Sequence, residues 1–169
     1  DLAPICNSAA TLSVVLDGNG TASINVSQID NGSVAQCDNS TIITTIDVSS
    51  FDCSDVGSGN IVTLTIADSN GQSSTCQTDV TVIDDEDPVI ACQNIMTTLD
   101  DDGMIVLEGF VIVTSASDNC GVVDTTINTS TINLNTIDCT PQNATATVTD
   151  QFGNTATCTF MIAIENNPP

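Results

Sequence analysis

Apolar and polar residues alternate along most of the chain, and a period of two is typical of β-strands with one buried face. In the first half, the segments Leu12 to Leu16 and Ala22 to Val26 follow this pattern on either side of an Asp-Gly-Asn-Gly turn. A hairpin is the simplest interpretation of these two segments. Later segments with the same alternation predict strands over residues 42–48, 61–67 and 73–83.

The alternation also assigns a face to each side chain. In the last predicted strand of the first half, Cys76, Val80 and Val82 share one face because even numbers of residues separate them. A strand near the end of the chain has the same plan, with Cys158, Phe160, Ile162 and Ile164 on one face. We therefore expect both cysteines on the core side of their sheets.

The chain repeats itself once. The cysteines form two quartets at offsets between 82 and 86 residues, in which Cys6, Cys37, Cys53 and Cys76 match Cys92, Cys120, Cys139 and Cys158. The segment ADSNGQSSTC at residues 67–76 also matches TDQFGNTATC at residues 149–158. The linker VIDDEDPVIAC at residues 82–92 shares its plan with the opening DLAPIC and the closing IENNPP. We expect two units, residues 1–83 and 84–169, that are cut from a longer series within its linkers.

Short strands separated by turn residues, in units of this length, predict an all-β fold of tandem immunoglobulin-like β-sandwich domains. The mixture of Val, Ile and Leu with many Thr and Ser also favours pleated strands over helices. A β-solenoid is the alternative fold. Its coils would repeat about every 20 to 30 residues, and the chain has no such period.

The charge balance restricts the possible partners. The chain has 22 acidic residues and no Lys, Arg or His, so side chains cannot form salt bridges with one another. The negative field repels nucleic acids and anionic membrane surfaces. A hard divalent cation with oxygen ligands best relieves the repulsion between carboxylates, so the composition indicates calcium as a cofactor.

The eight cysteines do not indicate a zinc site, because the chain has no His and no Cys-x-x-Cys pair. Disulfides are the better interpretation. They persist in oxidising compartments, so we expect an extracellular or cell-surface protein. The chain has no signal peptide and no apolar run of about 18 residues, which indicates a mature segment without direct membrane insertion.

Several motifs together resemble a known family. They are an Ile-x-Cys start, the sequences LDGNG at residues 16–20 and LDDDG at residues 99–103, a Cys-Asp-Asn or Asp-Asn-Cys-Gly motif, and the closing linker. They are similar to the hyalin (HYR) repeat and to related immunoglobulin-like repeats of giant secreted adhesins of Bacteroidetes-type bacteria, over the whole chain. The resemblance implies a stalk or an adhesin filament more than a particular ligand. Family members usually carry some Lys and Arg, which this chain lacks.

Four cysteines in a unit allow three connectivities. In a sandwich whose first and last strands run the same way between the linkers, Cys6 lies near Cys76, and Cys37 is left to pair with Cys53. The same scheme gives the second unit the pairs Cys92 with Cys158 and Cys120 with Cys139. Each domain is then expected to contain two intra-domain disulfides, and pairing between different chains is the alternative.

Four consecutive acids in the linker at residues 84–87 would repel one another unless a cation neutralised them. In the expected topology, loops of both units add oxygen ligands beside this linker. The predicted calcium site comprises Asp17, Asn19, Asp84, Asp85, Glu86, Asp87, Asp118, Asn119 and Asp150. A solvated acidic linker without a metal is the alternative, and residues 100–102 are expected to serve the next junction.

The sequence contains no catalytic constellation. Without His, Lys or Tyr, the available general acids and bases are Asp and Glu, and the aromatic platforms that usually hold sugar rings are scarce. We predict a non-enzymatic structural repeat segment of an extracellular stalk, filament or adhesin, joined to further copies of the repeat covalently or head to tail. The alternative is an adhesive module whose Thr-rich faces, including Thr145, Thr147 and Thr149, bind a glycan, ice or another cell surface.

Overall fold

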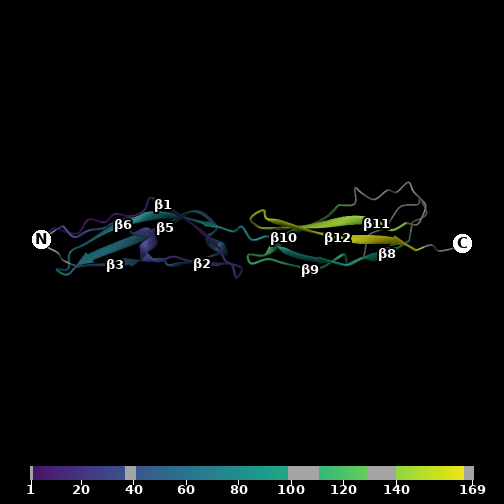
Figure 1. The fold of residues 1–169 in the computed structure, drawn as a ribbon, viewed down its shortest axis with the longest axis horizontal. Helices are drawn as coiled ribbons and strands as arrows, with labels where there is room; N and C mark the ends of the chain where they lie inside the picture. The colour runs from purple at the N-terminus through teal and green to yellow at the C-terminus, as the bar shows by residue number, and fades with distance from the viewer. Residues whose placement is uncertain (1, 37–40, 99–110, 129–139, 166–169) are drawn as a thin grey trace. The chain divides into compact units, whose positions relative to one another are not determined.

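Figure 1 shows the fold of the chain in a computed structural model, which describes residues 2–36, 41–98, 111–128 and 140–165. The chain divides into two compact units, Asp1–Asp85 and Glu86–Pro169. The described residues form mainly β-strands, so the all-β prediction is confirmed. No helix in these ranges is long and apolar enough to cross a membrane.

The first unit is built from strands and two short helical turns: β1 (Thr11–Val15), β2 (Thr21–Ser23), α1 (Val26–Ile29), β3 (Ile42–Ile46), β4 (Ser50–Asp52), η1 (Cys53–Asp55), β5 (Gly57–Asp68) and β6 (Ser73–Ile83). Four of the strands form a sheet in the order β1-β6-β5-β3. β1 runs parallel to β6, and the other neighbouring pairs are antiparallel. β2 and β4 pair antiparallel in a second, two-stranded sheet.

The predicted hairpin of Leu12 to Leu16 with Ala22 to Val26 is wrong. β1 pairs over its whole length with β6, and β2 pairs with β4, so the two segments belong to different sheets. Val26, which was predicted to end a strand, begins α1 instead. The reason is local, because the Asn25 side chain accepts a hydrogen bond from Ser27 N–H (3.0 Å) and caps a helical turn.

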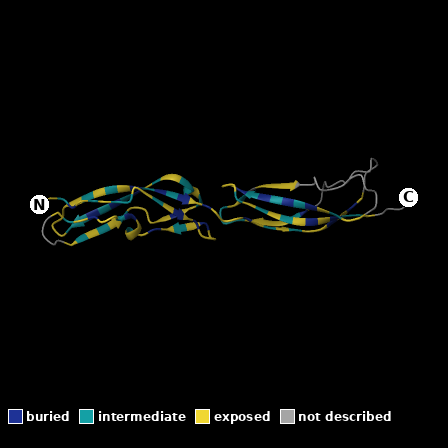
Figure 2. Ribbon diagram, turned by 45° about the horizontal axis from the view of Figure 1, so that its top comes forward, coloured by how far each residue is buried: buried dark blue, intermediate teal, exposed yellow. Residues whose placement is uncertain are grey.

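Alternate residues of β5 and β6 form the core of the first unit, and they are dark blue in Figure 2. Val62, Leu64 and Ile66 of β5 are fully buried, and so are Val80 and Val82 of β6. Residues of the opposite parity on these strands are exposed or half-buried. The prediction that Val80 and Val82 lie on the core side is therefore confirmed.

The second unit is built from β7 (Val89–Cys92), β8 (Ile95–Thr97), β9 (Val113–Ser117), β10 (Val122–Asn128), β11 (Gln142–Asp150) and β12 (Thr155–Ile164). Its larger sheet has the order β10-β11-β12-β8, with β8 parallel to β12 and the other pairs antiparallel. β7 and β9 pair antiparallel in a second sheet. Read from its other edge, this sheet has the order β8-β12-β11-β10, which corresponds to β1-β6-β5-β3 of the first unit. The relative strand directions are also the same in the two sheets.

The core of the second unit contains Phe160 and Ile162 of β12, which are buried together with Ala144 and Ala146 of β11. The half-buried Cys158 packs against this cluster. These three residues of β12 lie on the face that the alternation predicts, so the core side of this strand is also confirmed.

A disulfide ties the last strand of each unit to a segment near its beginning. Cys6 is bonded to Cys76 of β6, with Cα atoms 5.7 Å apart, and Cys92 of β7 is bonded to Cys158 of β12, with Cα atoms 5.9 Å apart. These are the pairs expected for the outer cysteines of each quartet. Cys53 and Cys120 are also disulfide-bonded. Their expected partners, Cys37 and Cys139, lie outside the described residues, as do residues 100–102 of the expected second junction.

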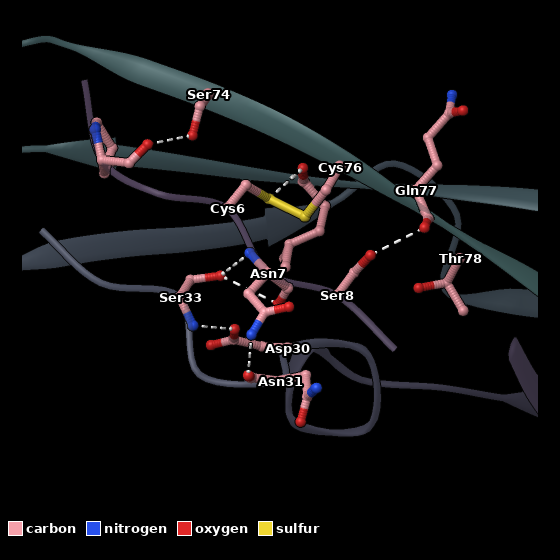
Figure 3. Close-up of a disulfide and its surroundings, with 12 residues drawn as sticks. Cys6, Asn7, Ser8, Asp30, Asn31, Ser33, Ser74, Cys76, Gln77 and Thr78 are labelled. Atoms are coloured by element: carbon pink, nitrogen blue, oxygen red, sulfur yellow. Dashed lines mark hydrogen bonds between the residues drawn. A yellow bond between two sulfur atoms is a disulfide. The ribbon is translucent and has the colours of Figure 1, made fainter. Parts of the chain in front are cut away.

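Hydrogen bonds hold the segment around Cys6 against the rest of the first unit, as Figure 3 shows. Asn7 N–H donates to Ser33 Oγ (3.0 Å), and the Ser8 hydroxyl donates to Gln77 O of β6 (2.8 Å). The disulfide is therefore one of several links between this N-terminal segment and the rest of the unit.

Candidate metal centre

Three aspartates that are far apart in the sequence come together in the structure. Asp84 directly follows β6, Asp118 directly follows β9, and Asp150 is the last residue of β11. One carboxylate oxygen of each residue can be chosen so that all three lie within 4.8 Å of one another. Asp84 and Asp150 are buried, and Asp118 is half-buried. Oxygen atoms gathered in this way can coordinate a single metal ion.

The turn after β11 orients Asp150. Its Oδ1 accepts hydrogen bonds from the main-chain N–H groups of Phe152 (2.8 Å), Gly153 (2.6 Å) and Asn154 (2.8 Å), and its Oδ2 accepts one from the Asn154 side-chain amide (2.7 Å). Gly153 has a φ of +99°, which other residues rarely adopt, and this conformation lets the turn fold back toward the carboxylate. Burial opposes the ionisation of Asp150, but the hydrogen bonds outweigh it and hold its pKa below the usual value. Asp150 is therefore a fixed and negatively charged group.

One carboxylate oxygen of Asp118 is buried and has no hydrogen-bond partner among the described residues. Its Oδ1 accepts a hydrogen bond from Cys120 N–H (2.8 Å), which fixes the side chain. Its Oδ2 is shielded from solvent and accepts no hydrogen bond within the described part of the chain. A buried carboxylate oxygen without a donor destabilises the folded state, and coordination to a metal ion would satisfy it.

The donor set of this site fits a hard cation. The three carboxylates repel one another, and the chain contains no Lys, Arg or His that could neutralise them. The amide oxygen of Asn119, next to Asp118 in the chain, is also shielded from solvent and is a neutral ligand of the kind that calcium accepts. A set of oxygen ligands without Cys or His suits calcium and does not suit zinc.

The remaining predicted carboxylates do not belong to this group of three. Residues 85–87 are exposed, and they do not belong to the group of three aspartates. Asp17 and Asn19 lie in the turn between β1 and β2, where the Asp17 carboxylate accepts hydrogen bonds from its own turn. Of the predicted carboxylates, the structure therefore brings together Asp84, Asp118 and Asp150.

Asp17 stabilises the turn after β1. Its Oδ1 accepts hydrogen bonds from Thr21 N–H (3.0 Å), from Asn19 N–H (2.9 Å) and from the Thr21 hydroxyl (3.1 Å). The main-chain bonds from Thr21 and Asn19 are the main reasons why the pKa of Asp17 lies below its usual value of 3.8. These hydrogen bonds account for the lowered pKa of Asp17 without a metal ion.

The stability of the first unit is expected to depend on pH through Asp17. Because the pKa is lower in the folded chain than in the unfolded chain, the ionised carboxylate stabilises the fold above the usual pKa of about 4. This stabilisation is lost as the pH falls through the lowered pKa of the folded state. Asp17→Asn should remove this part of the pH dependence in denaturant unfolding, whereas Thr21→Val should retain most of it because the main-chain donors remain. An NMR titration that places the Asp17 midpoint at its usual value would contradict the prediction.

The hydrogen-bonded turn around Asp150 was missed in the sequence, although a signal for it exists. The same kind of turn follows β5, where Asp68 Oδ1 accepts hydrogen bonds from Asn70 N–H (2.9 Å) and Gln72 N–H (2.9 Å). Both turns have Asp at the end of a strand and Gly three residues later. Asp side chains commonly hydrogen-bond to main-chain groups a few residues on, so this spacing indicates an oriented carboxylate.

No protein-family profile matches the chain, and no curated protein matches it in sequence. Its structure is similar to solved cadherin domains. Human protocadherin-24 EC1-2 aligns over 99% of this chain and 100% of that chain, with 15% identity and a TM-score of 0.44. Protocadherin gamma B2 domains 3-6 align over 98% of this chain and 52% of that chain, with 15% identity and a TM-score of 0.46. Drosophila N-cadherin EC1-4 aligns over 98% of this chain and 50% of that chain, with 10% identity and a TM-score of 0.49. This chain therefore spans about half the length of these two structures. At TM-scores below 0.5 these similarities decide neither fold nor function, which rest here on the strand pairing, the disulfides and the aspartates.

Proposed function

We propose that the chain is a structural repeat segment of an extracellular stalk, filament or adhesin, and that Asp84, Asp118 and Asp150 bind calcium. The observation that carries the calcium proposal is the buried Asp118 Oδ2, which accepts no hydrogen bond from the described residues and belongs to a group of three carboxylates. Asn119 is the neutral ligand beside them. The exposed residues 85–87 attract cations to this region without coordinating the same ion.

The disulfides support a location outside the cytoplasm. Cys6–Cys76 and Cys92–Cys158 each close a long loop within one unit, and such bonds persist in oxidising environments. A high density of negative charge also keeps an extracellular segment soluble and separate from nucleic acids and anionic surfaces.

The common strand order of the two larger sheets supports a tandem repeat of HYR-like, immunoglobulin-like domains at residues 1–83 and 84–169. The aligned cysteines point the same way, because the disulfides Cys6–Cys76 and Cys92–Cys158 join matching positions. The proposed partners are further copies of the same repeat, joined covalently or head to tail.

Calcium would also have a mechanical effect. Asp84 directly follows β6 and opens the acidic segment of residues 84–87. An ion that Asp84 helps to bind would restrain this acidic segment. A series of such restrained connections gives a stiff stalk, whereas acidic connections without an ion remain extended and mobile.

Calcium binding can be tested by isothermal titration calorimetry of the whole chain. Asp118→Asn is expected to weaken calcium binding by about tenfold or more, because losing even an outer-shell partner typically lowers metal affinity about 10- to 100-fold. The substitution keeps the shape of the side chain and the hydrogen bond from Cys120 N–H, so the loop should remain folded.

The matched control is Asp87→Asn, which makes the same change of charge at an exposed residue of the linker. Its calcium affinity is expected to stay close to that of the wild-type chain. If both variants weaken calcium binding equally, calcium associates non-specifically with the acidic linker, and the proposed site is wrong.

A further inference from the structure

Threonines line the outer face of the larger sheet in the second unit. In β11 and β12, alternate residues point away from the buried Ala144, Ala146 and Phe160. We call this surface the threonine face, and with one residue of the edge strand β10 it comprises Thr126, Thr145, Thr147, Thr149, Thr155, Thr157 and Thr159.

The strand register arranges these threonines in rows across the sheet. Thr145 pairs with Thr159, Thr147 with Thr157, and Thr149 with Thr155, and Thr126 extends the middle row because it pairs with Thr147. Neighbouring strands lie about 4.8 Å apart, and residues on one face of a strand repeat about every 6.7 Å. The threonine face therefore repeats the same type of side chain at regular spacings, both along the strands and across them.

Each threonine presents a methyl group and a hydroxyl group in a restricted orientation, because the branch at Cβ limits its χ1 rotamers. The threonines of this face on β10 and β12 are exposed, and those on β11 are half-buried. None of the described residues forms a hydrogen bond with their hydroxyl groups. These hydroxyls are therefore available to a ligand.

The threonine face is nearly neutral in a chain with a net charge of −22. Asp124, which pairs with Thr149 on the edge strand, lies at its margin. The seven threonines are uncharged, and a single carboxylate, that of Asp124, continues the row of Thr149 and Thr155 at the edge strand. A neutral ligand that offers hydrogen bonds at regular intervals matches this surface.

We propose that the threonine face binds the surface of ice. An ice surface is a neutral lattice of hydrogen-bond donors and acceptors, and its repeats are of the same order as the strand and residue spacings of this face. The hydroxyls can hydrogen-bond to lattice water, while the methyl groups displace liquid water from the rows between them. A soluble sugar, in contrast, is usually held in a concave site with aromatic side chains. This role is independent of the calcium site.

The equivalent face of the first unit has no such lattice and provides a matched control. Its larger sheet has the same strand order, and Thr65 pairs there with Thr75. The next two rows, however, are Thr63 with Gln77 and Ile61 with Asp79. The first unit therefore offers one threonine row in the same sheet position without the surrounding array.

Ice-affinity partitioning of the whole chain tests the proposal: ice is grown slowly from a protein solution, and the protein in the ice and in the liquid is measured. The wild-type chain is expected to be enriched in the ice. Thr147→Arg with Thr157→Arg is expected to abolish this enrichment, because the long charged side chains prevent the middle row of threonines from contacting the ice surface. Thr65→Arg with Thr75→Arg makes the same change on the first unit and should leave the enrichment intact. Circular dichroism and the unfolding midpoint establish that the variants are folded.

A milder variant keeps the test decisive where the arginine pair does not fold. Thr147→Val with Thr157→Val retains the branched shape and the strand propensity, removes two hydroxyls and is expected to reduce the enrichment. Exclusion of the wild-type chain from ice, or equal losses for the two arginine pairs, overturns the proposal. Retention of the wild-type chain on crystalline cellulose, lost in the Thr147 variants, also overturns it, because the ligand is then a polysaccharide.

Discussion

Removal of the Cys6–Cys76 disulfide is expected to lower the free energy of unfolding of the first unit by about 4 kcal/mol. The bond joins residues separated by 70 positions, and a cross-link over a loop of this length greatly restricts the unfolded chain. Small domains are stable by only about 5 to 15 kcal/mol, so this loss is a large part of the total. Denaturant unfolding of the chain with Cys6→Ala and Cys76→Ala measures it.

The second unit provides the control for this experiment. The Cys92–Cys158 bond has a similar separation of 66 positions, so Cys92→Ala with Cys158→Ala should have a similar effect on the second unit. Each pair of substitutions is expected to shift the transition of its own unit, because the two units form separate compact structures. A single transition that shifts equally for both variants would mean that the units unfold together.

Saturating calcium is expected to stabilise the chain by about 2.7 kcal/mol when its free concentration reaches about 100 times the dissociation constant. The gain would arise because the proposed ligands Asp84, Asp118 and Asp150 lie close together in the folded chain and separate when it unfolds. The same ion should narrow the range of arrangements of the two units, because it restrains the segment that follows Asp84. Calorimetric unfolding measures the stability, and small-angle X-ray scattering measures the range of dimensions.

Two comparisons separate this effect from general screening of charge. Magnesium should substitute poorly, because its small octahedral shell suits a group of carboxylates and an amide less well than calcium does. Asp118→Asn should lose most of the calcium-dependent change in both measurements, whereas Asp87→Asn should keep it. Identical scattering with calcium and with chelator in the wild-type chain would show that no ion restrains the connecting segment.

Properties that depend on neighbouring residues could be read from the sequence. The alternation along β6 and β12 correctly assigned Val80, Val82, Phe160 and Ile162 to the core, because the period of two is an intrinsic property of a strand. The excess of acidic residues also led to the prediction of a cation as partner, since charge is a property of composition, and this stays a prediction.

Pairing between distant strands could not be read in the same way. The segments around β1 and β2 resemble a hairpin locally, but β1 lies beside β6, which is more than fifty residues away in the chain. The choice depends on which long edge is available after the sheet has formed, and short-range patterns carry no information about it. The register that places Thr147 beside Thr157 and Thr126 also became visible only in the folded sheet.

The same distinction between local sequence and long-range pairing applies to the candidate metal centre. Sequence by itself determined that acids are dense at residues 84–87. Only the tertiary structure decided that Asp84 and Asp150 are buried and Asp118 is half-buried, while residues 85–87 remain exposed. The physical reason is that a metal site requires oxygen atoms within a few ångströms of one point, and folding, which brings distant loops together, determines which carboxylates meet there.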